Sequence, residues 1–268
     1  MRTRKRIPCA LTIAGSDSGG GAGIQADLKT FAALGVHGTS VITCITAQNP
    51  RRVLGIQPCS LPIVELQLEA VFSELRPAAV KTGMLYSTTL IGAVARFLRR
   101  QRVPVVVDPV MVATSGARLL KPAAIRTLRE QLLPRATLVT PNLSEAELLV
   151  GETIRSVEGL RQAARELHRR FGCAALVKGG HLRGLREAAD IFYDGKQELL
   201  LSAPFVRGVS THGTGCTFSA AVAGLLARGC SLPVAVKRAK EHVTQAIAQS
   251  RVSAGHYVLN SFWRQPEL

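Results

Sequence analysis

The sequence T-H-G-T-G-C-T at residues 211–217 leads into an apolar run that is typical of a buried helix, with Phe218 and Leu225 among its members. Gly213 and Gly215 allow the backbone to turn tightly and bring its amide groups close to a ligand. The unpaired N–H groups and the positive dipole end of a helix attract anions. The stretch therefore predicts an anion-binding helix start. The alternative is a glycine-rich helix start without a ligand, of a kind found in many proteins.

Cys216 falls in the first turn of this predicted helix. The field at a helix N-terminus lowers the pKa of a thiol from its usual value of about 8.5, so we expect a reactive cysteine at the rim of the anion site. The alternative is a small cysteine that is simply buried. Companion motifs elsewhere in the chain must decide between these two interpretations.

The length and hydropathy of the chain favour one large α/β domain. It has 268 residues, of which 47% are apolar, and no apolar run approaches the roughly 18 residues that span a bilayer. The N-terminus combines basic residues with an apolar stretch, as a signal peptide does, but that stretch is short and is followed by glycines rather than a cleavage site. We predict a basic tail at residues 1–8, one domain at residues 9–268 and no membrane partner.

The cysteines and charges narrow the class further. Six cysteines are scattered without a C-x-x-C pair, which argues against zinc and against a disulfide framework and favours a reducing cytoplasm. The formal net charge of +16 favours anionic partners, so nucleic acid must be considered. Only 4% of residues are aromatic, and no RNA-recognition or zinc-finger signature is present. We interpret the arginines as solvated helix faces that help to attract nucleotides and phosphorylated substrates, and we predict no nucleic-acid partner.

A second glycine-rich loop follows the apolar residues 9–14 and precedes a helical pattern. Within it, G-A-G-I-Q-A at residues 21–26 fits the dinucleotide pattern G-x-G-x-x-A, so a dinucleotide-binding protein is an alternative. The acidic residue expected at the end of the next strand is absent, because residues 40–46 lead into A-Q-N-P. Asp27 borders the buried stripe of the predicted helix, where it either binds a ligand or flanks the core.

Polar side chains follow several of the predicted strands. Gln48 follows residues 40–46, Asp108 follows the apolar run 103–107, and Lys178 ends residues 174–178. In open α/β sheets, ligands bind at the carboxyl ends of the strands. An amide such as Gln48 suits an aminopyrimidine edge, a carboxylate suits a metal, and a lysine suits a phosphate. The alternatives are a loop-capping glutamine, a turn-forming aspartate before Pro109 and a snorkelling lysine.

Asn142 and Glu145 have the spacing of a capping box, in which two side chains satisfy backbone donors at a helix start. This structural explanation suffices by itself. The functional alternative is that both residues lie beside nucleotide phosphates and their magnesium.

The order of the elements predicts the fold. Strands alternate with helices along the chain, and Asp194-Gly195 is a strong two-residue hairpin signal between residues 190–193 and 197–202. We predict an α/β fold: a single three-layer α/β/α domain with right-handed crossovers and a mostly parallel central sheet that gains an antiparallel edge hairpin.

The motifs together resemble the hydroxymethylpyrimidine/phosphomethylpyrimidine kinases of thiamine biosynthesis, which belong to the ribokinase-like superfamily. The resemblance spans residues 9–250, and no Walker A sequence is present. It rests on G-S-D-S-G-G-G-A-G-I-Q-A-D-L-K-T (15–30), A-Q-N (47–49), K-T-G-M (81–84), D-P-V-M (108–111), T-P-N-L-S-E (140–145), V-K-G-G-H (177–181) and T-H-G-T-G-C-T (211–217).

The resemblance implies ATP-dependent phosphorylation of hydroxymethylpyrimidine to its monophosphate and then to the diphosphate. It implies a catalytic loop of Gly213, Gly215 and Cys216, with Cys216 as the base that accepts the hydroxyl proton. The residues that it places around the pyrimidine are Gly15, Asp27, Gln48 and Met84. The residues that it places near ATP are Asp108, Asn142, Glu145, Lys178 and Thr211. Magnesium would bind through the phosphates, with Asp108 and Glu145 as candidate ligands.

The alternative within the same fold is a pyridoxine or pyridoxal kinase. The resemblance also suggests a homodimer. One departure lies near the C-terminus, where A-G-H-Y-V-L-N at residues 254–260 carries Tyr257 in place of a small residue of a G-H-G-P-like segment. This leaves the C-terminal contacts open but affects none of the predicted site residues.

Overall fold

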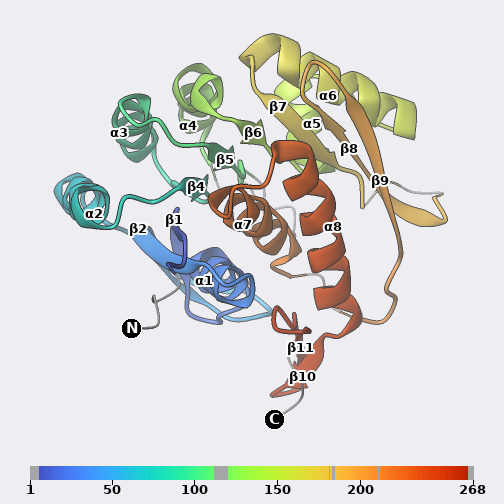
Figure 1. Cartoon of the computed structure of the whole chain (residues 1–268), viewed down its shortest axis with the longest axis horizontal. Helices are drawn as coiled ribbons and strands as arrows, with labels where there is room; N and C mark the ends of the chain where they lie inside the picture. Colours follow the sequence, from blue (N-terminus) through green and yellow to red (C-terminus); the bar gives the residue numbers. More distant parts are fainter. Residues whose placement is uncertain (1–5, 112–119, 181, 183–184, 210–211, 265–268) are drawn as a thin grey trace.

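The computed structural model describes residues 6–111, 120–180, 182, 185–209 and 212–264. Its centre is a nine-stranded sheet in the order β3-β2-β1-β4-β5-β6-β7-β8-β9 (Figure 1). The strands are β1 (Cys9–Asp17), β2 (His37–Gln48), β3 (Val53–Pro58), β4 (Ala79–Thr82), β5 (Val105–Val107), β6 (Leu138–Val139), β7 (Ala174–Lys178), β8 (Glu187–Tyr193) and β9 (Glu198–Pro204).

The pairing of the strands confirms the predicted mixed sheet. The six adjacent strands β2, β1, β4, β5, β6 and β7 pair in parallel. Strands β8 and β9 continue the sheet as the antiparallel hairpin that Asp194-Gly195 predicted. The opposite edge was not predicted: β3 pairs antiparallel with β2. The sheet therefore has an antiparallel strand at each edge and parallel strands in the middle.

Helices cover both faces of the sheet, which confirms the three layers. One face carries α1 (Gly23–Ala33), α7 (Thr214–Ala227) and α8 (Leu232–Ala248) (Figure 1). The other carries α2 (Leu61–Glu74), α3 (Thr88–Arg99), α4 (Pro122–Thr127), α5 (Leu143–Val150) and α6 (Val157–Phe171). Helix α4 passes at Leu128 into a π turn and then a 3-10 turn that ends at Arg135.

Alternation along the central strands explains the two cores. Val105 and Val107 pack in the core on the α2–α6 side, whereas Val106 packs in the core beneath α1, α7 and α8. All three side chains are fully buried. Side chains alternate between the faces of a strand, so a continuous apolar run predicts a strand that is covered on both sides.

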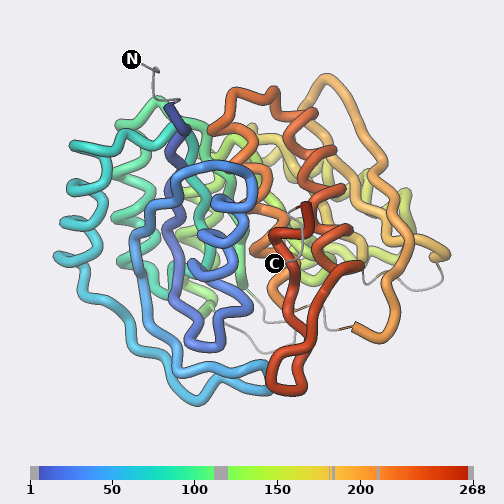
Figure 2. The backbone as a smooth tube through the Cα atoms, turned by 60° about the horizontal axis from the view of Figure 1, so that its bottom comes forward, coloured from blue at the N-terminus to red at the C-terminus, as the bar shows by residue number. Residues whose placement is uncertain are grey.

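A short hairpin that was not predicted follows α8. Helix α8 ends at Ala248 and is followed by β10 (Arg251–Ser253) and β11 (His256–Val258), which pair antiparallel. The turn between them carries positive φ angles at Ala254 and Gly255. The hairpin lies beside the connection between β2 and β3 (Figure 2). Among the described residues, no helix combines the length and the hydropathy of a membrane span.

Candidate functional site

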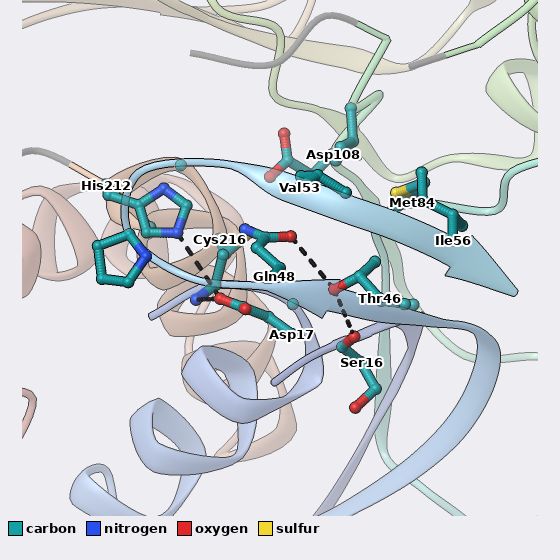
Figure 3. A pocket seen from close by; sticks show the side chains of 18 of the residues that line it. Ser16, Asp17, Thr46, Gln48, Val53, Ile56, Met84, Asp108, His212 and Cys216 are labelled. Atoms are coloured by element: carbon teal, nitrogen blue, oxygen red, sulfur yellow. Dashed lines mark hydrogen bonds and ion pairs between the residues drawn. The ribbon is translucent and has the colours of Figure 1, made fainter. Parts of the chain in front are cut away.

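A pocket of about 490 Å³ lies where the parallel strands end (Figure 3). It brings together residues that are far apart in the sequence, so Gln48 and Cys216 share one cavity. The predicted site residues that line it are Gly15, Gln48, Met84, Asp108, Asn142, Glu145, Lys178, Gly213, Gly215 and Cys216. Their roles toward a ligand stay predictions. The predicted ATP-binding residue Thr211 lies outside the described residues.

The two glycine-rich loops contact each other at one end of the pocket. Gly213 has a φ of +83°, and a Cβ at this position would overlap the carbonyl oxygen of Gly21. Gly23 has a φ of +56°, and a Cβ there would overlap the carbonyl oxygen of Gly15. Both positions require glycine, because other residues rarely adopt this conformation and have no room for a side chain. The loops are therefore held at backbone contact.

Helix α7 begins directly at the second loop. Gly213 is its N-cap and offers no side chain to the first turn, and the first helical hydrogen bond runs from the Thr217 N–H to the Gly213 carbonyl. Gly215 and Cys216 lie in this first turn and line the pocket. The N-terminus of a 14-residue helix thus points at the pocket, as the sequence predicted, and it suits a phosphate group.

Lys178 and Asp108 lie against this helix start. The Lys178 Nζ is 3.3 Å from an Asp108 carboxylate oxygen, and the Ser219 hydroxyl donates to the other oxygen at 3.1 Å. A Cβ added to Gly215 would lie 3.2 Å from the Lys178 Nζ. Burial alone would lower the pKa of Lys178, but the charges of Asp108 and Glu145 outweigh it and raise the pKa. The lysine therefore carries a positive charge at the predicted phosphate site.

Glu145 and Asn142 form the predicted capping box at the start of α5. The Asn142 side chain accepts from the Glu145 N–H at 2.9 Å, and Glu145 accepts from the Asn142 N–H at 2.9 Å. The other Glu145 oxygen accepts from the Met111 N–H at 2.9 Å. Burial, reinforced by the charge of Asp108, raises the pKa of Glu145 to about 7. Both residues also line the pocket, so the capping role does not exclude contact with a ligand, and their position beside the nucleotide phosphates stays a prediction.

The prediction of a lowered thiol pKa at Cys216 is wrong for the ligand-free protein. Burial raises the pKa of Cys216 to about 11; the charge of Lys81 opposes this, and those of Asp27 and Asp108 add to it. The desolvation of a thiolate in this enclosed position therefore outweighs the field of the helix.

Asp27 lies behind the pocket wall rather than on it. Its carboxylate is fully buried, 2.8 Å from the Lys81 Nζ, and it accepts a hydrogen bond from the Thr12 hydroxyl at 2.6 Å. Lys81 is also fully buried from solvent, yet it lines the pocket, whereas Asp27 does not. The arrangement places Lys81 at the wall, and a role for Asp27 toward the pyrimidine stays a prediction that would act through this lysine.

Asp17 and His212 form a link between the two glycine loops that sequence reasoning missed. The Asp17 carboxylate accepts from the N–H groups of Gly19 at 2.8 Å and Ala22 at 2.8 Å, and it lies 3.6 Å from the His212 Nε2. Burial opposes ionisation, but His212 and the backbone donors together lower the pKa of Asp17. An aspartate within a glycine-rich loop was the available signal, but its histidine partner is distant in the sequence.

Gln48 lines the pocket near Cys216 and Thr46 (Figure 3). The Thr46 hydroxyl lies 2.9 Å from the Ser16 carbonyl oxygen and 3.2 Å from the Gln48 Oε1, so it fixes the amide group. Val53 and Ile56 of β3 and Met84 supply apolar wall. Sequence reasoning missed the two β3 residues because it did not predict this strand.

Tyr257 lies at a smaller cavity of about 90 Å³ beside the main pocket. The cavity is lined by the C-terminal hairpin, by Pro50 from the β2–β3 connection, and by Asp17 and His212, which also line the main pocket. The segment that departs from the family pattern thus packs at the edge of the candidate site.

The fold, and the solved kinases that it resembles, define a ribokinase-like kinase of a small molecule, in which the start of α7 opens into the pocket. The profile of the phosphomethylpyrimidine kinase family matches residues 17–260, and the chain belongs to this family.

Known proteins with similar sequences and structures agree with this assignment. The chain is 53% identical over 248 residues to a hydroxymethylpyrimidine/phosphomethylpyrimidine kinase of Rhizobium meliloti, covering 92% of this chain and 93% of the relative. The structure is similar to phosphomethylpyrimidine kinase from Clostridium difficile, with a TM-score of 0.80, 41% identity and coverage of 89% and 99%. It is also similar to Bacillus subtilis pyridoxal kinase in an ADP complex, with a TM-score of 0.88, 38% identity and coverage of 96% and 98%.

Proposed function

We propose that this protein transfers the γ-phosphoryl group of ATP to the 5-hydroxymethyl oxygen of hydroxymethylpyrimidine, and then transfers a second phosphoryl group to the resulting monophosphate, as an enzyme of thiamine biosynthesis. The observation that carries the proposal is one pocket that joins the Gln48 end to the start of α7 and Lys178. The names of the relatives in the same family support it. We infer that residues 9–268 act as one kinase domain.

The acceptor end would bind the pyrimidine. Gln48 both donates and accepts hydrogen bonds, so it can recognise the amino edge of the ring, and Thr46 holds its amide in place. Met84 would contact the ring, and Gly15 leaves room for it. A Cβ at Gly15 would lie 2.7 Å from the sulfur of the buried Cys44, so a larger residue would displace the core behind Gly15.

The donor end would align the phosphates. The N–H groups of the first turn of α7 and the Lys178 ammonium stabilise the charge of the transferring group, and phosphoryl transfer depends chiefly on such alignment and neutralisation. The acceptor oxygen bonds to the γ-phosphorus, the bond to the β-phosphate oxygen breaks, and ADP leaves. The hydroxyl proton passes to the Cys216 thiolate, which forms once substrate binding has released the thiol proton to solvent.

Magnesium fits the donor end. Among the described residues, no cluster of three or more acidic, histidine or cysteine side chains could hold a metal by itself. Mg²⁺ is usually held by one or two carboxylates together with substrate phosphates and water, which suits Asp108 and Glu145. The bound ion would neutralise phosphate charge, and because Glu145 has a pKa raised to about 7, metal binding would favour its ionised form.

A product-resolved assay tests the proposal. The protein is incubated with hydroxymethylpyrimidine, ATP and magnesium, and the products are separated over time. We expect the monophosphate first and then the diphosphate, with ADP formed in step with both. ATP that stays intact with the alcohol, or NADH fluorescence enhancement without ATP turnover, would support a different function and contradict the proposal.

Pyridoxal is the second candidate acceptor, because the solved structures that resemble this chain at a TM-score of 0.88 include pyridoxal kinases. Competition between the two alcohols in the same ATP assay separates the candidates. We expect hydroxymethylpyrimidine to suppress pyridoxal phosphorylation at equal concentrations. Preferential phosphorylation of pyridoxal would reverse the order of the two candidates.

We further propose that the protein acts in the cytoplasm as a homodimer. Apolar side chains are exposed along β2, β3 and α2, at Ile45, Leu54, Ile63 and Leu66. Contiguous exposed apolar groups are typical of protein interfaces. Light scattering coupled to gel filtration would give about twice the chain mass of 28.6 kDa, and Leu54→Glu would shift it toward the monomer.

A further inference from the structure

The connection between β2 and β3 forms a fixed hairpin tip at the mouth of the pocket. The Asn49 N–H donates to the Arg52 carbonyl oxygen at 3.1 Å. The Asn49 side chain in turn accepts from the N–H groups of Arg51 at 2.9 Å and Arg52 at 3.0 Å. Both arginines line the pocket. The backbone of the tip is therefore closed by its own hydrogen bonds.

The tip lies next to the C-terminal hairpin. Pro50, next to the two arginines, shares the smaller cavity with Tyr257 and Val258 of the C-terminal hairpin. The two hairpins lie side by side in Figure 2.

Arg51 and Arg52 differ from the lysines of the pocket in their charge partners. Each of the two lysines that line the pocket is paired with a carboxylate: Lys81 is 2.8 Å from Asp27, and Lys178 is 3.3 Å from Asp108. Within the described part of the chain, neither Arg51 nor Arg52 has a carboxylate oxygen within 4.0 Å of its guanidinium group. The mouth of the pocket therefore carries positive charge that the described protein does not neutralise.

The two phosphorylations make different demands on this charge. The first acceptor is a neutral alcohol. The second is a phosphate ester, which carries a charge of about −1.5 to −2 at pH 7. It would enter a pocket that already holds Asp108, Glu145 and the ATP phosphates, so it needs additional cations. Guanidinium groups suit this task because they donate parallel hydrogen bonds to phosphate oxygens.

We propose that Arg51 and Arg52 bind the phosphate group of the monophosphate substrate and so favour the second phosphorylation over the first. This rests on the proposed kinase function. In the second step an ionised oxygen of the substrate phosphate bonds to the γ-phosphorus of ATP, and the bond to ADP breaks. The arginines do not take part in bond formation; they determine which acceptor is bound.

The test compares the two acceptors in one variant. Arg51→Ala/Arg52→Ala is assayed with the alcohol and with the monophosphate as separate starting substrates at saturating ATP. We expect kcat/KM for the monophosphate to fall about tenfold or more, and to fall at least about fivefold further than kcat/KM for the alcohol. The KM for ATP should stay within about twofold of the unaltered enzyme.

Two further variants serve as controls. Arg99→Ala/Arg100→Ala removes an adjacent, exposed arginine pair at the end of α3, outside the pocket, and should leave the ratio of the two kcat/KM values as it is. Arg51→Lys/Arg52→Lys keeps the charge and should restore part of the monophosphate activity. Added salt should raise the KM for the monophosphate in the unaltered enzyme more than in the alanine variant.

Three results would overturn the proposal. They are an equal loss with both acceptors, no loss with the monophosphate, and a KM for ATP that rises as much as that for the monophosphate. If the alanine variant does not fold, the lysine variant and the salt series decide. Inactivity of the unaltered enzyme with both acceptors would instead refute the kinase function itself, so the two failures are distinguishable.

Discussion

At the scale of single residues, the unusual feature is an uncharged cysteine at the proposed site of proton transfer. Burial raises the pKa of Cys216 to about 11 in the ligand-free protein, so its thiol is protonated at neutral pH. The positive charge of Lys81, which lines the pocket, opposes this rise in the pKa. A base at this position therefore depends on substrate binding to favour the thiolate, and rapid labelling of the free enzyme by alkylating reagents is not expected.

Substitution of Cys216 tests its role as the base. We expect Cys216→Ser to lower kcat for the alcohol by about 100-fold or more while changing pyrimidine affinity little, because a general base contributes roughly 10² to 10⁴ in rate. The second step should be affected less, because a phosphate oxygen is already ionised. Steady-state kinetics with each acceptor provide the measurement. Cys230→Ser, outside the pocket, is the control, and an unchanged kcat in Cys216→Ser would remove the assignment.

The buried pair of Asp27 and Lys81 makes a second prediction at this scale. Both side chains are fully buried, so Lys81→Met leaves an isolated carboxylate and should destabilise the protein by about 3 to 5 kcal/mol. Urea unfolding measures the loss. Adding Asp27→Asn should recover part of it, because the unpaired charge is removed. If Asp27→Asn lowered the free energy of unfolding as much in the Lys81→Met variant as in the unaltered protein, the two residues would not be coupled.

At the scale of elements, the contact between the two glycine loops positions the start of α7. Gly213→Ala should lower both stability and kcat/KM, the latter by about 100-fold, because its Cβ would push the anion-binding turn away from Gly21. Gly151→Ala is a matched control: its φ of +84° is nearly the same, but nothing lies within 4 Å of the added Cβ. It should cost about 1 to 2 kcal/mol and leave activity intact.

Thermal unfolding and steady-state kinetics of the two glycine variants provide the comparison. Equal behaviour of both variants would show that only the backbone conformation matters at Gly213. It would contradict the importance of the close approach between the loops.

A buried histidine on helix α8 should make the stability of the protein depend on pH. His242 is buried on α8 beside Trp263, and burial, with the charge of Arg264 adding to it, lowers its pKa to about 4. The unfolded state binds this proton below about pH 6.5, whereas the folded state does so only near pH 4, so stability falls as the pH falls through this window. Urea unfolding at pH 7 and pH 5 should show a smaller acid loss for His242→Phe than for the unaltered protein. An identical loss in both would contradict the assignment.

The elements differ in how well the sequence predicts them. Central strands and their polar ends were predictable, because continuous apolar runs such as residues 105–107 can only be covered on both faces. Strand β3 was not, since V-L-G-I-Q-P is mostly exposed and carries no alternation. The site residues at strand ends followed from the fold. The pairs Asp17–His212 and Asp27–Lys81 did not, because each partnership depends on tertiary packing between distant segments.

At the scale of the whole molecule, the residues that line the pocket come together at the carboxyl ends of the parallel strands. Strands β1, β2, β5 and β7 end at the pocket, and α7 begins there, so the residues that line the pocket are held by the same parallel core. The antiparallel strand β3 adds a wall on one side, and the C-terminal hairpin lies next to the mouth. Ligand binding should therefore stabilise the fold as a whole, because the loops that it contacts come from the N-terminal, central and C-terminal thirds of the chain.

Nucleotide binding should raise the melting temperature of the protein through Lys178. At a concentration of ATP and magnesium about 100 times the Kd, the native state gains about 2.7 kcal/mol, which corresponds to roughly 5 to 10 °C for a chain of this size. Lys178→Met should lower the starting melting temperature, because it leaves Asp108 without its lysine partner, and should lose most of the nucleotide-dependent rise. Lys196→Met, in the exposed β8–β9 turn, should keep the full rise. Scanning calorimetry with and without nucleotide measures both shifts. A full rise in Lys178→Met would separate the lysine from the phosphate site and would require another cation of the pocket to bind the nucleotide.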